Sequence, residues 1–480
     1  MTSIHETAYP RFKPDLTQRE LDEIYTPNET EQRFARRLGR SNASRLYLMI
    51  LLKTVQRLGY FPMVADVPPS IVSFVTKALG LKLVPLCALV EEEKSRSRRD
   101  FIDAIRAHLK IHPITKDTDK AIELAATQAA QTKQELADII NVIIEELIRQ
   151  RYELPAFSRL NRTAFRIRNQ VNELYYHTLT DPLPAAVTSQ FDAMLTLSAG
   201  QLVTGWQQIK QDPKKPTNTE VRQYLERVKW LKSWACELPQ VDHIPVVKRG
   251  QYVYEARALD AADLKAMQQN KRYALMVLLF HAQLSKALDD AVDIFVRKMR
   301  KLHSGALEQL QLYYQEHQKR AEKLVSQLRD VLEAFQEGET DQDRGKRIAG
   351  AMHDNPEKLL AECEEHMAYA GNNYLPFMLV PYQTQRPLLL NCLGLLDLES
   401  TSADLSLIES IRFVLANRQS HKEWLSIVDT NINLKWLPEK WRRPVTGQRS
   451  GPVTEVNRKY FELCVLTEAM QELQSGDLYV

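Results

Sequence analysis

Residues 133–150 read KQELADIINVIIEELIRQ and predict a helix more clearly than any other part of the chain. Apolar side chains recur there every three or four residues, at Leu136, Ile139, Ile140, Ile143, Ile144, Leu147 and Ile148. This spacing places them along one face of an α-helix. Just before this stripe, Thr132 and Glu135 form the sequence pattern of a capping box. The stretch therefore predicts an amphipathic helix whose apolar face belongs to a core.

A strongly basic segment follows, in which residues 149–168 read RQRYELPAFSRLNRTAFRIR. It holds six arginines, no lysine and a single acid, Glu153. Pro155 interrupts the helical pattern, and Ser158 is placed to cap a second helix that ends at Asp181, which precedes a proline. The charge therefore gathers around a joint between two predicted helices.

The second helix predicts one apolar face and one basic face. The apolar face carries Leu160, Ala164, Ile167, Val171 and Leu174. At about 100° per residue, Arg159, Arg162 and Arg166 lie within about 60° of one another and away from that face. Two interpretations stay open for this row: a solvated helix face, or a contact with phosphates. Arginine suits phosphates because its planar fork donates two hydrogen bonds to paired oxygens.

Two further basic clusters precede this one. Residues 33–57 hold seven basic side chains and no acid, and residues 94–110 hold six against two acids. The formal net charge of the whole chain is only +3, so the positive charge is concentrated near its start. Such asymmetry is typical of nucleic-acid binding. The predicted DNA-binding residues are Arg36, Arg37, Arg40, Arg45, Arg96, Arg98, Arg99, Arg149, Arg151, Arg159, Arg162 and Arg166.

The composition favours helix throughout. The chain has 480 residues and 15 glycines, where ordinary usage would give about 34. Few glycines and many Leu, Ala, Glu, Gln, Lys and Arg residues favour helices, and this length favours about two to four domains. We therefore predict a mainly α, multi-domain protein with little or no β-structure.

The N-terminal region predicts a helix-turn-helix shape. Thr26 and Glu29 form a capping-box pattern before a first helix that stops at Gly39. A second helix runs from about Asn42 to Gly59, after a short turn. Because the second helix is apolar nearly all round, we expect it to form a core and not to lie exposed in a groove of DNA.

The remainder of the chain predicts more helix. Residues 305–335 predict a long helix with loosely heptad-spaced leucines, which leads into the acidic loop QEGETDQD. Residues 243–259, HIPVVKRGQYVYEARAL, are the segment that suggests a strand or hairpin. The predicted domains are an N-terminal helical DNA-binding domain at 1–180, a second helical domain at 181–304, the long helix and acidic loop at 305–345, and a helical linker region at 346–480.

The sequence shows no catalytic or metal-binding motif. The sequence CEEH places Cys363 and His366 one helical turn apart, yet nothing completes a tetrahedral ligand set. The acids Asp289, Asp290 and Asp293 could bind a cation, but a solvated acidic helix face is the simpler interpretation. No phosphate-cradling glycine-rich loop, Gly-x-Ser-x-Gly or His-Glu-x-x-His motif occurs. We therefore predict no catalytic residue and no metal site in this chain.

Cysteines and apolar runs predict the compartment. The five cysteines are dispersed without a Cys-x-x-Cys pair, which is typical of reduced thiols in the cytosol. The start, MTSIHETAYPRFKPD, is too polar for a signal peptide. The longest apolar run, at 46–52, is far shorter than the ~20 residues that span a bilayer. These features predict a cytoplasmic location and no membrane partner.

Four stretches read SRLYLMILLKTVQRLGYFP, YELPAFSRLNRTAFRIRNQVNELYY, GNNYLPFMLVPYQTQRPLLL and INLKWLPEKWRRPVTG. They resemble the TnpA transposases of the class II replicative transposons, the Tn-three family. The final VNRKYFELCVLTEAMQELQSGDLYV is similar to the segment that leads into the catalytic domain of that family. The resemblance extends in order over essentially the whole chain, and the N-terminal part resembles the DUF4158 transposase domain of unknown function.

The resemblance implies that separate domains recognise the DNA and catalyse its cleavage. Family members recognise the terminal inverted repeats of their transposon through helical N-terminal domains, and a C-terminal RNase H-like domain cleaves and joins the DNA. Three acids of that domain, the DDE triad, hold divalent metal, normally Mg²⁺. This chain stops at Val480, where the catalytic domain of the family only begins. We therefore expect no catalytic acid and no cofactor here, with Mg²⁺ needed only by the missing domain.

Two functions of different classes follow. The preferred one is an N-terminal transposase part that binds double-stranded DNA at the terminal inverted repeats and helps to assemble the transposition complex, inactive in strand transfer alone. In that case, contacts with base edges or sugars of the DNA could come from the side chains of Asn161, Thr163, Asn169 and Asn172. The alternative is a helical regulatory protein that forms a homodimer through 305–335, or that binds and inhibits a full-length transposase.

Overall fold

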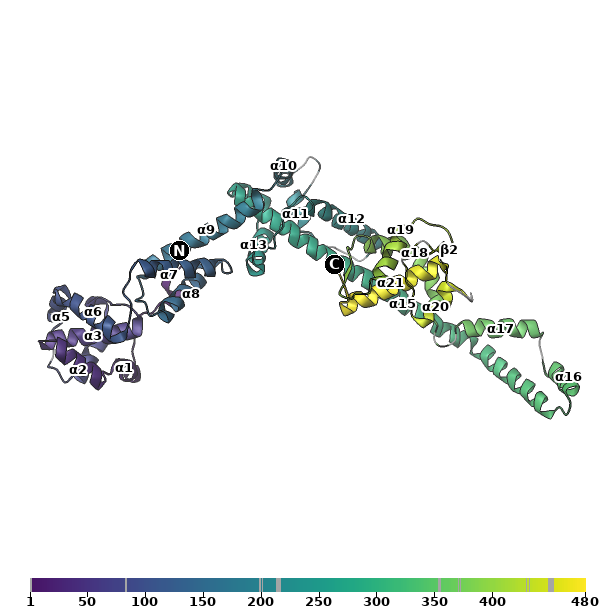
Figure 1. The fold of residues 1–480 in the computed structure, drawn as a ribbon, viewed down its shortest axis with the longest axis horizontal. Coiled ribbons are helices and arrows are strands. Elements are labelled where there is room, and N and C mark those ends of the chain that lie inside the picture. Colours follow the sequence, from purple (N-terminus) through teal and green to yellow (C-terminus); the bar gives the residue numbers. More distant parts are fainter. Residues whose placement is uncertain are drawn as a thin grey trace. The chain divides into compact units, whose positions relative to one another are not determined.

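In this computed structural model the protein is built almost entirely of helices (Figure 1). The structure describes residues 2–480 except 83, 198–199, 201, 213–216, 353–354, 370, 372, 429, 431 and 448–452. The helices of the first part are α1 (Gln18–Tyr25), α2 (Glu29–Leu38), α3 (Asn42–Leu58), α4 (Pro69–Ala78), α5 (Leu86–Lys94), α6 (Ser97–Leu109), α7 (Lys116–Ala130), α8 (Leu136–Arg149), α9 (Phe157–Thr180) and α10 (Ala185–Met194). Short 3-10 turns lie at Ile4–Glu6 and Val64–Asp66.

The later helices are α11 (Gly205–Ile209), α12 (Asn218–Ala235), α13 (Val246–Ala258), α14 (Ala261–Ala266), α15 (Gln269–Glu337), α16 (Asp341–Ala351), α17 (Pro356–Ala368), α18 (Leu375–Leu393), α19 (Ser406–Ala416), α20 (Glu439–Thr446) and α21 (Arg458–Ser475). Two short antiparallel pairs supply the strands of the described residues: β1 (Glu399–Ser400) with β4 (Leu478–Tyr479), and β2 (Trp424–Ser426) with β3 (Glu455–Asn457). The prediction of a mainly α protein with little β-structure is confirmed.

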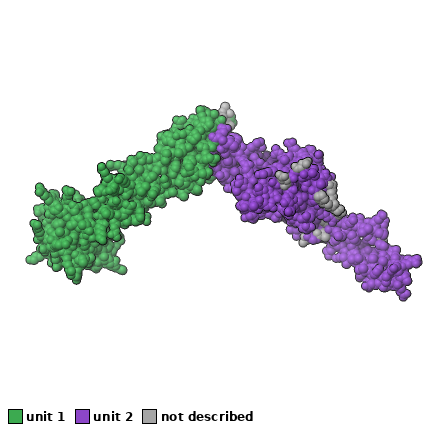
Figure 2. Space-filling model, viewed as in Figure 1, with its two compact units in different colours: residues 1–208, 238–279 green, residues 209–237, 280–480 purple. Residues whose placement is uncertain are grey.

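The chain divides into two compact units, which Figure 2 colours separately. Unit 1 comprises residues 1–208 and 238–279, and unit 2 comprises residues 209–237 and 280–480. The units interleave along the sequence because α12 belongs to unit 2, whereas α13 and α14 belong to unit 1. The four consecutive domains predicted from the sequence remain a prediction.

The first bundle of unit 1 is built around α3. Every side chain from Leu46 to Leu52 is buried, so the prediction that this helix forms a core is confirmed. Ser41 caps its start, and Gly59 ends it in the left-handed conformation. The cap predicted for the preceding helix was placed too early: Asn28 is the N-cap residue of α2 and makes the capping box with Glu31.

Helices α7, α8 and α9 form a second bundle in unit 1. The apolar stripe of α8 is buried as predicted, except that Ile148 is exposed. The predicted capping box is wrong, because Glu135 is itself the N-cap residue of α8 and its side chain makes no capping bond. The N-terminal residues lie on this bundle (Figure 1), where the Tyr9 hydroxyl donates to the Pro155 carbonyl at 2.9 Å.

Helix α9 ends just before Asp181, as predicted. Its N-cap residue is Ala156, which offers no side-chain bond, so the predicted Ser158 cap is wrong. Four of the five residues predicted for its apolar face are buried, but Leu174 is 62% exposed. The helical phase was therefore right, and the buried face is shorter than the sequence suggested.

Helix α13 occupies the segment that the sequence predicted as a strand or hairpin. Its buried residues Lys248, Tyr252 and Ala256 follow one another at a spacing of four, and the Tyr252 hydroxyl donates to Asn172 of α9 at 2.7 Å. The residues that suggested a strand include Val247 and Tyr254, which are exposed. Packing of one helical face overrides strand propensity here.

The long helix α15 starts well before the predicted position. Gly305, which marked the predicted start, lies inside the helix, with open space where a side chain would be. A glycine inside a helix costs only about 1 kcal/mol relative to alanine, which is small against the packing of a helix of 69 residues.

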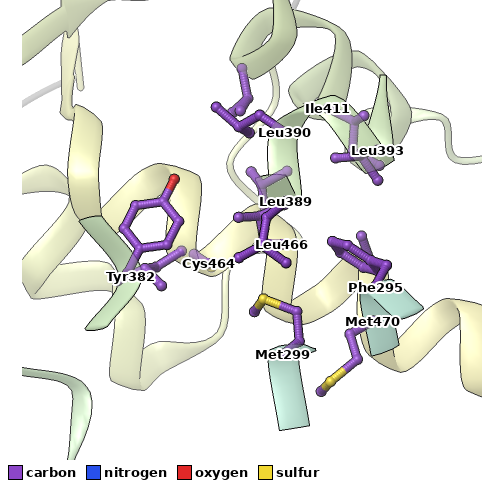
Figure 3. Packing of buried hydrophobic residues seen from close by; sticks show 14 of the residues in the cluster. Phe295, Met299, Tyr382, Leu389, Leu390, Leu393, Ile411, Cys464, Leu466 and Met470 are labelled. Carbon is purple, nitrogen blue, oxygen red and sulfur yellow. The ribbon is translucent and has the colours of Figure 1, made fainter. Parts of the chain in front are cut away.

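The core of unit 2 gathers residues of α15, α18, α19, α20 and α21. Figure 3 shows Phe295 and Met299 of α15 beside Leu466 and Met470 of α21. The short pair of β1 and β4 brings residues 399–400 beside residues 478–479. Throughout the described ranges, no helix has both the length and the apolar character that crossing a membrane requires.

Candidate nucleic-acid interface

The arginine row of α9 is exposed, but two of its members already have partners. Arg159 forms an ion pair with Asp119, and Arg166 forms one with Glu123, both on α7. All four side chains are about half exposed, and ion pairs at such sites contribute only about 0–1 kcal/mol. A phosphate could therefore replace either carboxylate at low cost. Arg162 forms no ion pair with any residue that the structure describes.

The first basic cluster places three arginines on the surface around the turn between α2 and α3. Arg36, Arg37 and Arg40 are exposed, and none of them forms an ion pair within the described part of the chain. Arg45 differs, because it is half-buried and its Nε donates to the carbonyl of Gly39 at 2.9 Å. The first three are therefore available to an anion, and Arg45 stabilises the turn.

Two basic side chains of the clusters are used inside the fold. Lys53 is buried, with Nζ 3.3 Å from a carboxylate oxygen of Glu31. Arg98 donates from Nη1 to Glu93 at 2.6 Å and to the Tyr47 hydroxyl at 3.2 Å. Burial raises the pKa of Tyr47 to about 12, so this hydroxyl stays protonated and accepts from Arg98. These cations hold α2, α3, α5 and α6 together.

The start of α6 forms an open, arginine-lined hollow of about 650 Å³. Arg96, Arg98, Arg99 and Arg106 line it together with one acid, Asp100. Arg96 and Arg99 form no ion pair with a described residue, whereas Arg98 and Arg106 do. Only two of the four arginines therefore carry charge that the fold leaves uncompensated.

The joint between α8 and α9 is held against the first bundle by specific contacts. The Leu154 N–H donates to the Gly59 carbonyl at 2.8 Å. Glu153 is buried and forms an ion pair with Arg106 at 2.6 Å. Gly59 has a φ of 73°, and a Cβ there would lie 3.0 Å from the Leu154 side chain. The single acid of the basic segment therefore serves to hold the two bundles of unit 1 together.

Arg149 and Arg151 have different environments at this joint. Arg149 forms an ion pair with Glu146, one turn earlier on α8. Arg151 is exposed, forms no ion pair with a described residue and has a left-handed backbone with a φ of 56°. It lines a second hollow together with Arg57, which the sequence prediction left out of the candidate set. The sequence shows Arg57 at the end of the first basic cluster, two residues before Gly59. It does not show that Arg57 and Arg151 line the same hollow, because that depends on the tertiary fold.

Two of the four side chains that the sequence offered for contacts with bases or sugars, Asn161 and Asn172, are buried inside unit 1. Asn172 is buried and accepts a hydrogen bond from the Tyr252 hydroxyl at 2.7 Å. Asn161 is buried as well, and its Nδ2 donates to the Thr2 carbonyl at 3.5 Å. Thr163 and Asn169 remain half-exposed. Asn161 and Asn172 therefore stabilise unit 1, and only the other two could reach DNA.

The sequence contains two sets of residues with possible metal ligands, Cys363 with His366, and the aspartates 289, 290 and 293. Among the residues that the structure describes, no group of three or more His, Cys, Asp or Glu side chains is placed to hold a metal ion. Asp290 accepts a hydrogen bond from the Tyr224 hydroxyl at 2.8 Å, and Asp293 forms an ion pair with Arg297. Asp290 and Asp293 therefore make contacts within unit 2.

Comparisons with known proteins match both the N-terminal region and nearly the whole length of the chain. A family model described as a domain of unknown function, DUF4158, matches residues 1–167. The transposase for transposon Tn501 of Pseudomonas aeruginosa is 24% identical over 486 residues and covers 98% of this chain. The transposase for transposon Tn3926 of Escherichia coli is 25% identical over 471 residues and covers 96% of it. Over nearly its whole length the chain is therefore similar to Tn3-family transposases.

The Tn3-family relatives are longer than this chain. It spans about half of their length, 47% of the Tn501 transposase and 46% of the Tn3926 transposase. The transposase for transposon Tn1546 of Enterococcus faecium, 20% identical over 448 residues, is matched over 44% of its length. The DUF4158 match takes in helices α1 to α8 and the start of α9. All the candidate arginines therefore lie within this one domain.

Proposed function

We propose that this chain is the DNA-recognition part of a Tn3-family transposase. It binds double-stranded DNA at the terminal inverted repeats of its transposon and helps to assemble the transposition complex. The homology to transposases supports DNA as the partner. The observation that carries the proposal is the set of exposed arginines of the DUF4158 domain that have no ion pair to a described residue. The members of this set that the sequence predicted are Arg36, Arg37, Arg40, Arg96, Arg99, Arg151 and Arg162.

These arginines suit a phosphate backbone for a physical reason. They are already hydrated, so binding a phosphate exchanges water and counterions for a charge-assisted, two-pronged hydrogen bond. Arg149, Arg159 and Arg166 would add to the surface when a phosphate replaces their carboxylate partners. Phosphate contacts fix the register of a protein on DNA, and contacts to bases then select the sequence.

Fluorescence anisotropy tests the proposal with two labelled duplexes, one that ends in the terminal repeat and one with the same bases scrambled. We expect tighter binding to the repeat. If about six phosphates are neutralised, the logarithm of the affinity falls with the logarithm of salt concentration with a slope near −5. Equal affinity for both duplexes would exclude specific recognition. No binding even at low salt would exclude the DNA-binding function itself.

We further propose that this binding needs no metal ion. Cleavage and strand transfer belong, on this proposal, to a DDE domain with Mg²⁺, and we assign no catalytic residue to this chain. Affinity measured in EDTA and in Mg²⁺, at matched ionic strength, should be the same. A strict requirement for Mg²⁺ would contradict the proposal and indicate a metal site within the complex.

A second function is suggested by an apolar stripe near the end of α15. Val325, Leu328, Leu332 and Phe335 recur at a spacing of three and four, and each is at least 50% exposed. A stripe with this spacing is what a coiled coil buries between two helices. We therefore propose a homodimer, or a complex with a full-length transposase that it inhibits.

Sedimentation velocity of the whole chain tests this dimer. We expect the wild-type chain to dimerise and a Leu328→Lys, Leu332→Lys variant to stay monomeric. Leu124→Lys, an exposed leucine on α7, serves as the matched control. A wild-type chain that is monomeric at every concentration would exclude the homodimer.

A further inference from the structure

Three helices of unit 1 end close together at the joint between α8 and α9. Helices α3, α6 and α8 are followed by Gly59, Lys110 and Arg151, which have left-handed backbones with φ of 73°, 55° and 56°. The backbone ties these ends together, because the His112 N–H donates to the Arg151 carbonyl and the Leu154 N–H donates to the Gly59 carbonyl, both at 2.8 Å. The joint is therefore a defined site and not a loose connection.

Arg151 stands where glycine would cause less strain. Lys110 and Arg151 are the non-glycine residues with positive φ in the part of the chain that the structure describes. A Cβ atom makes this conformation unfavourable. At Gly59 glycine is required, because a Cβ there would crowd Leu154. A strained backbone under a side chain that lines a hollow indicates that the side chain has a role there.

The hollow at this joint has a volume of about 350 Å³. Arg57 and Arg151 are the charged residues of its lining, and no acid lines it among the described residues. Most of the remaining lining is apolar and includes Leu109 and Ile111, which are partly exposed, and Ile148, which is 56% exposed. Neither arginine forms an ion pair within the described ranges. The site thus combines two unpaired guanidinium groups with an exposed apolar surface.

The partial negative charges at the three helix ends repel an anion, so the sign of the net charge at the joint decides whether a phosphate is attracted. A helix C-terminus carries about half an elementary negative charge, and three of them bring roughly one and a half. Arg57, Lys110 and Arg151 bring three positive charges. The side chains outweigh the helix ends, and the net charge at the joint stays positive.

We propose that this hollow binds one deoxyribose-phosphate unit of the DNA backbone. The phosphate accepts hydrogen bonds from Arg57 and Arg151, and the sugar lies against the apolar surface formed by Leu109, Ile111 and Ile148. The inference rests on the proposed DNA-binding function and adds a particular place of contact. It also brings together two basic clusters that are far apart in the sequence, 33–57 and 149–168.

The contacts around the joint explain why this site would be ready before DNA arrives. The ion pair between Arg106 and Glu153 and the backbone bonds of His112 hold the ends of α6 and α8 in place. The two arginines therefore project from helix ends that already have fixed contacts. Binding then orders only side chains, which reduces its entropic cost.

The experiment uses the full chain with Arg57→Gln and Arg151→Gly, separately and together. Arg19→Gln is the matched control, since Arg19 is an exposed arginine of α1 that is paired with Glu23 and does not line the hollow. Each test variant should weaken binding to the terminal-repeat duplex about tenfold, because a charge-assisted bond is lost. Each should also reduce the salt slope by about 1. The control should change affinity less than either variant.

Single neutral methylphosphonates placed along the duplex then locate the contact. The wild-type chain should lose affinity when one particular phosphate, or its neighbour, is made neutral. The double variant should be insensitive at that same position and unchanged elsewhere. Free thymidine monophosphate should not displace the duplex at concentrations near that of the protein; displacement would identify a free nucleotide as the ligand and overturn the inference.

Thermal melting separates this role from a structural one. Arg151→Gly relieves the left-handed strain, so its melting temperature should equal or exceed that of the wild type. Arg151→Asn, which also tolerates positive φ, repeats the measurement. A fall in melting temperature in both variants would show that Arg151 is structural. Wild-type affinity and phosphate pattern in the double variant would overturn the inference while leaving DNA binding intact. Absence of DNA binding by the wild-type chain would refute the proposed function first.

Discussion

Two arginines of unit 2, Arg386 and Arg458, face a buried carboxylate, whereas most of the candidate arginines of unit 1 face solvent. In unit 2 Glu462 is 1% exposed, and Arg386 reaches both of its oxygens, each at 2.7 Å. The Tyr382 hydroxyl donates to the same carboxylate at 2.6 Å, and Arg458 approaches it at 3.5 Å. Burial beside Glu462 raises the pKa of Tyr382 far above its usual range, so this hydroxyl remains a donor.

The contrast shows what decides the role of an arginine. A carboxylate buried with it makes the guanidinium part of the core, where separation of the charges would be costly. Without such a partner the guanidinium stays hydrated and can bind a phosphate. Arg386 and Arg36 are chemically the same side chain, and their surroundings alone set them apart.

The largest expected effect is on the buried cluster. Glu462→Ala leaves Arg386 and Arg458 without their counter-charge, and the free energy of unfolding should fall by about 3–5 kcal/mol. Chemical denaturation followed by circular dichroism measures it. Glu439→Ala is the control, because that exposed acid pairs with Arg442 at the surface and should cost no more than about 1 kcal/mol. Equal losses in the two variants would remove the contrast between buried and exposed arginines.

The next effect concerns the outward-facing arginines. Replacing Arg36, Arg37 and Arg40 together by glutamine should weaken DNA binding about a hundredfold and reduce the salt slope by nearly 3. Stability should fall by no more than about 1 kcal/mol, since none of the three has an ion pair to a described residue and the exposed Arg37 guanidinium lies over the Phe34 ring. Anisotropy and thermal melting measure the two quantities. Unchanged affinity would place this surface away from the DNA.

Lys248 provides an intermediate case, a buried cation that faces carbonyl groups. Its Nζ donates to the Lys133 carbonyl at 3.1 Å and to the side chain of Gln134. Burial, with a smaller contribution from Arg168, lowers the pKa of Lys248 to about 8. Between about pH 8 and pH 10.4 the unfolded chain therefore holds a proton that the folded chain has released, so stability rises with pH across this window.

The Lys248→Met variant isolates this dependence. The wild type should gain about 2 kcal/mol of unfolding free energy relative to the variant as the pH rises from about 8 to about 10. Tyrosines also titrate near the upper limit, so the difference between the two proteins is the quantity to compare. Denaturant titrations at several pH values provide it. Parallel pH profiles would show that Lys248 stays charged throughout.

The smallest effect is expected for the arginine row of α9. Replacing Arg159, Arg162 and Arg166 by glutamine should weaken DNA binding only about tenfold, less than the variant on α2, because two of the three already have carboxylate partners. The opposite change, Asp119→Asn with Glu123→Gln, should strengthen binding several-fold by releasing Arg159 and Arg166. Circular dichroism should be unchanged in both variants. Unfolding would show that the row is structural.

Part of the candidate site was predictable from the sequence. The periodicity of α9 placed Arg159, Arg162 and Arg166 on its exposed side, because apolar side chains at helical spacing define the buried side. The same periodicity could not exclude Asn161 and Asn172, since a polar residue can be buried when another element supplies a partner, as Tyr252 does for Asn172. The assignment of the arginines to DNA remains a proposal.

Local patterns in the sequence determined the helical class, the buried stripe of α8 and the buried helix α3, because side-chain periodicity and helix propensity act over a few residues. The extent and relationships of these helices were decided by the tertiary structure. Glycine at 305 did not end α15, and packing on α9 made a helix of the residues that suggested a strand. Only the fold paired Arg106 with Glu153 and brought Arg57 beside Arg151, because such contacts join residues far apart in the chain whose distance no local pattern records.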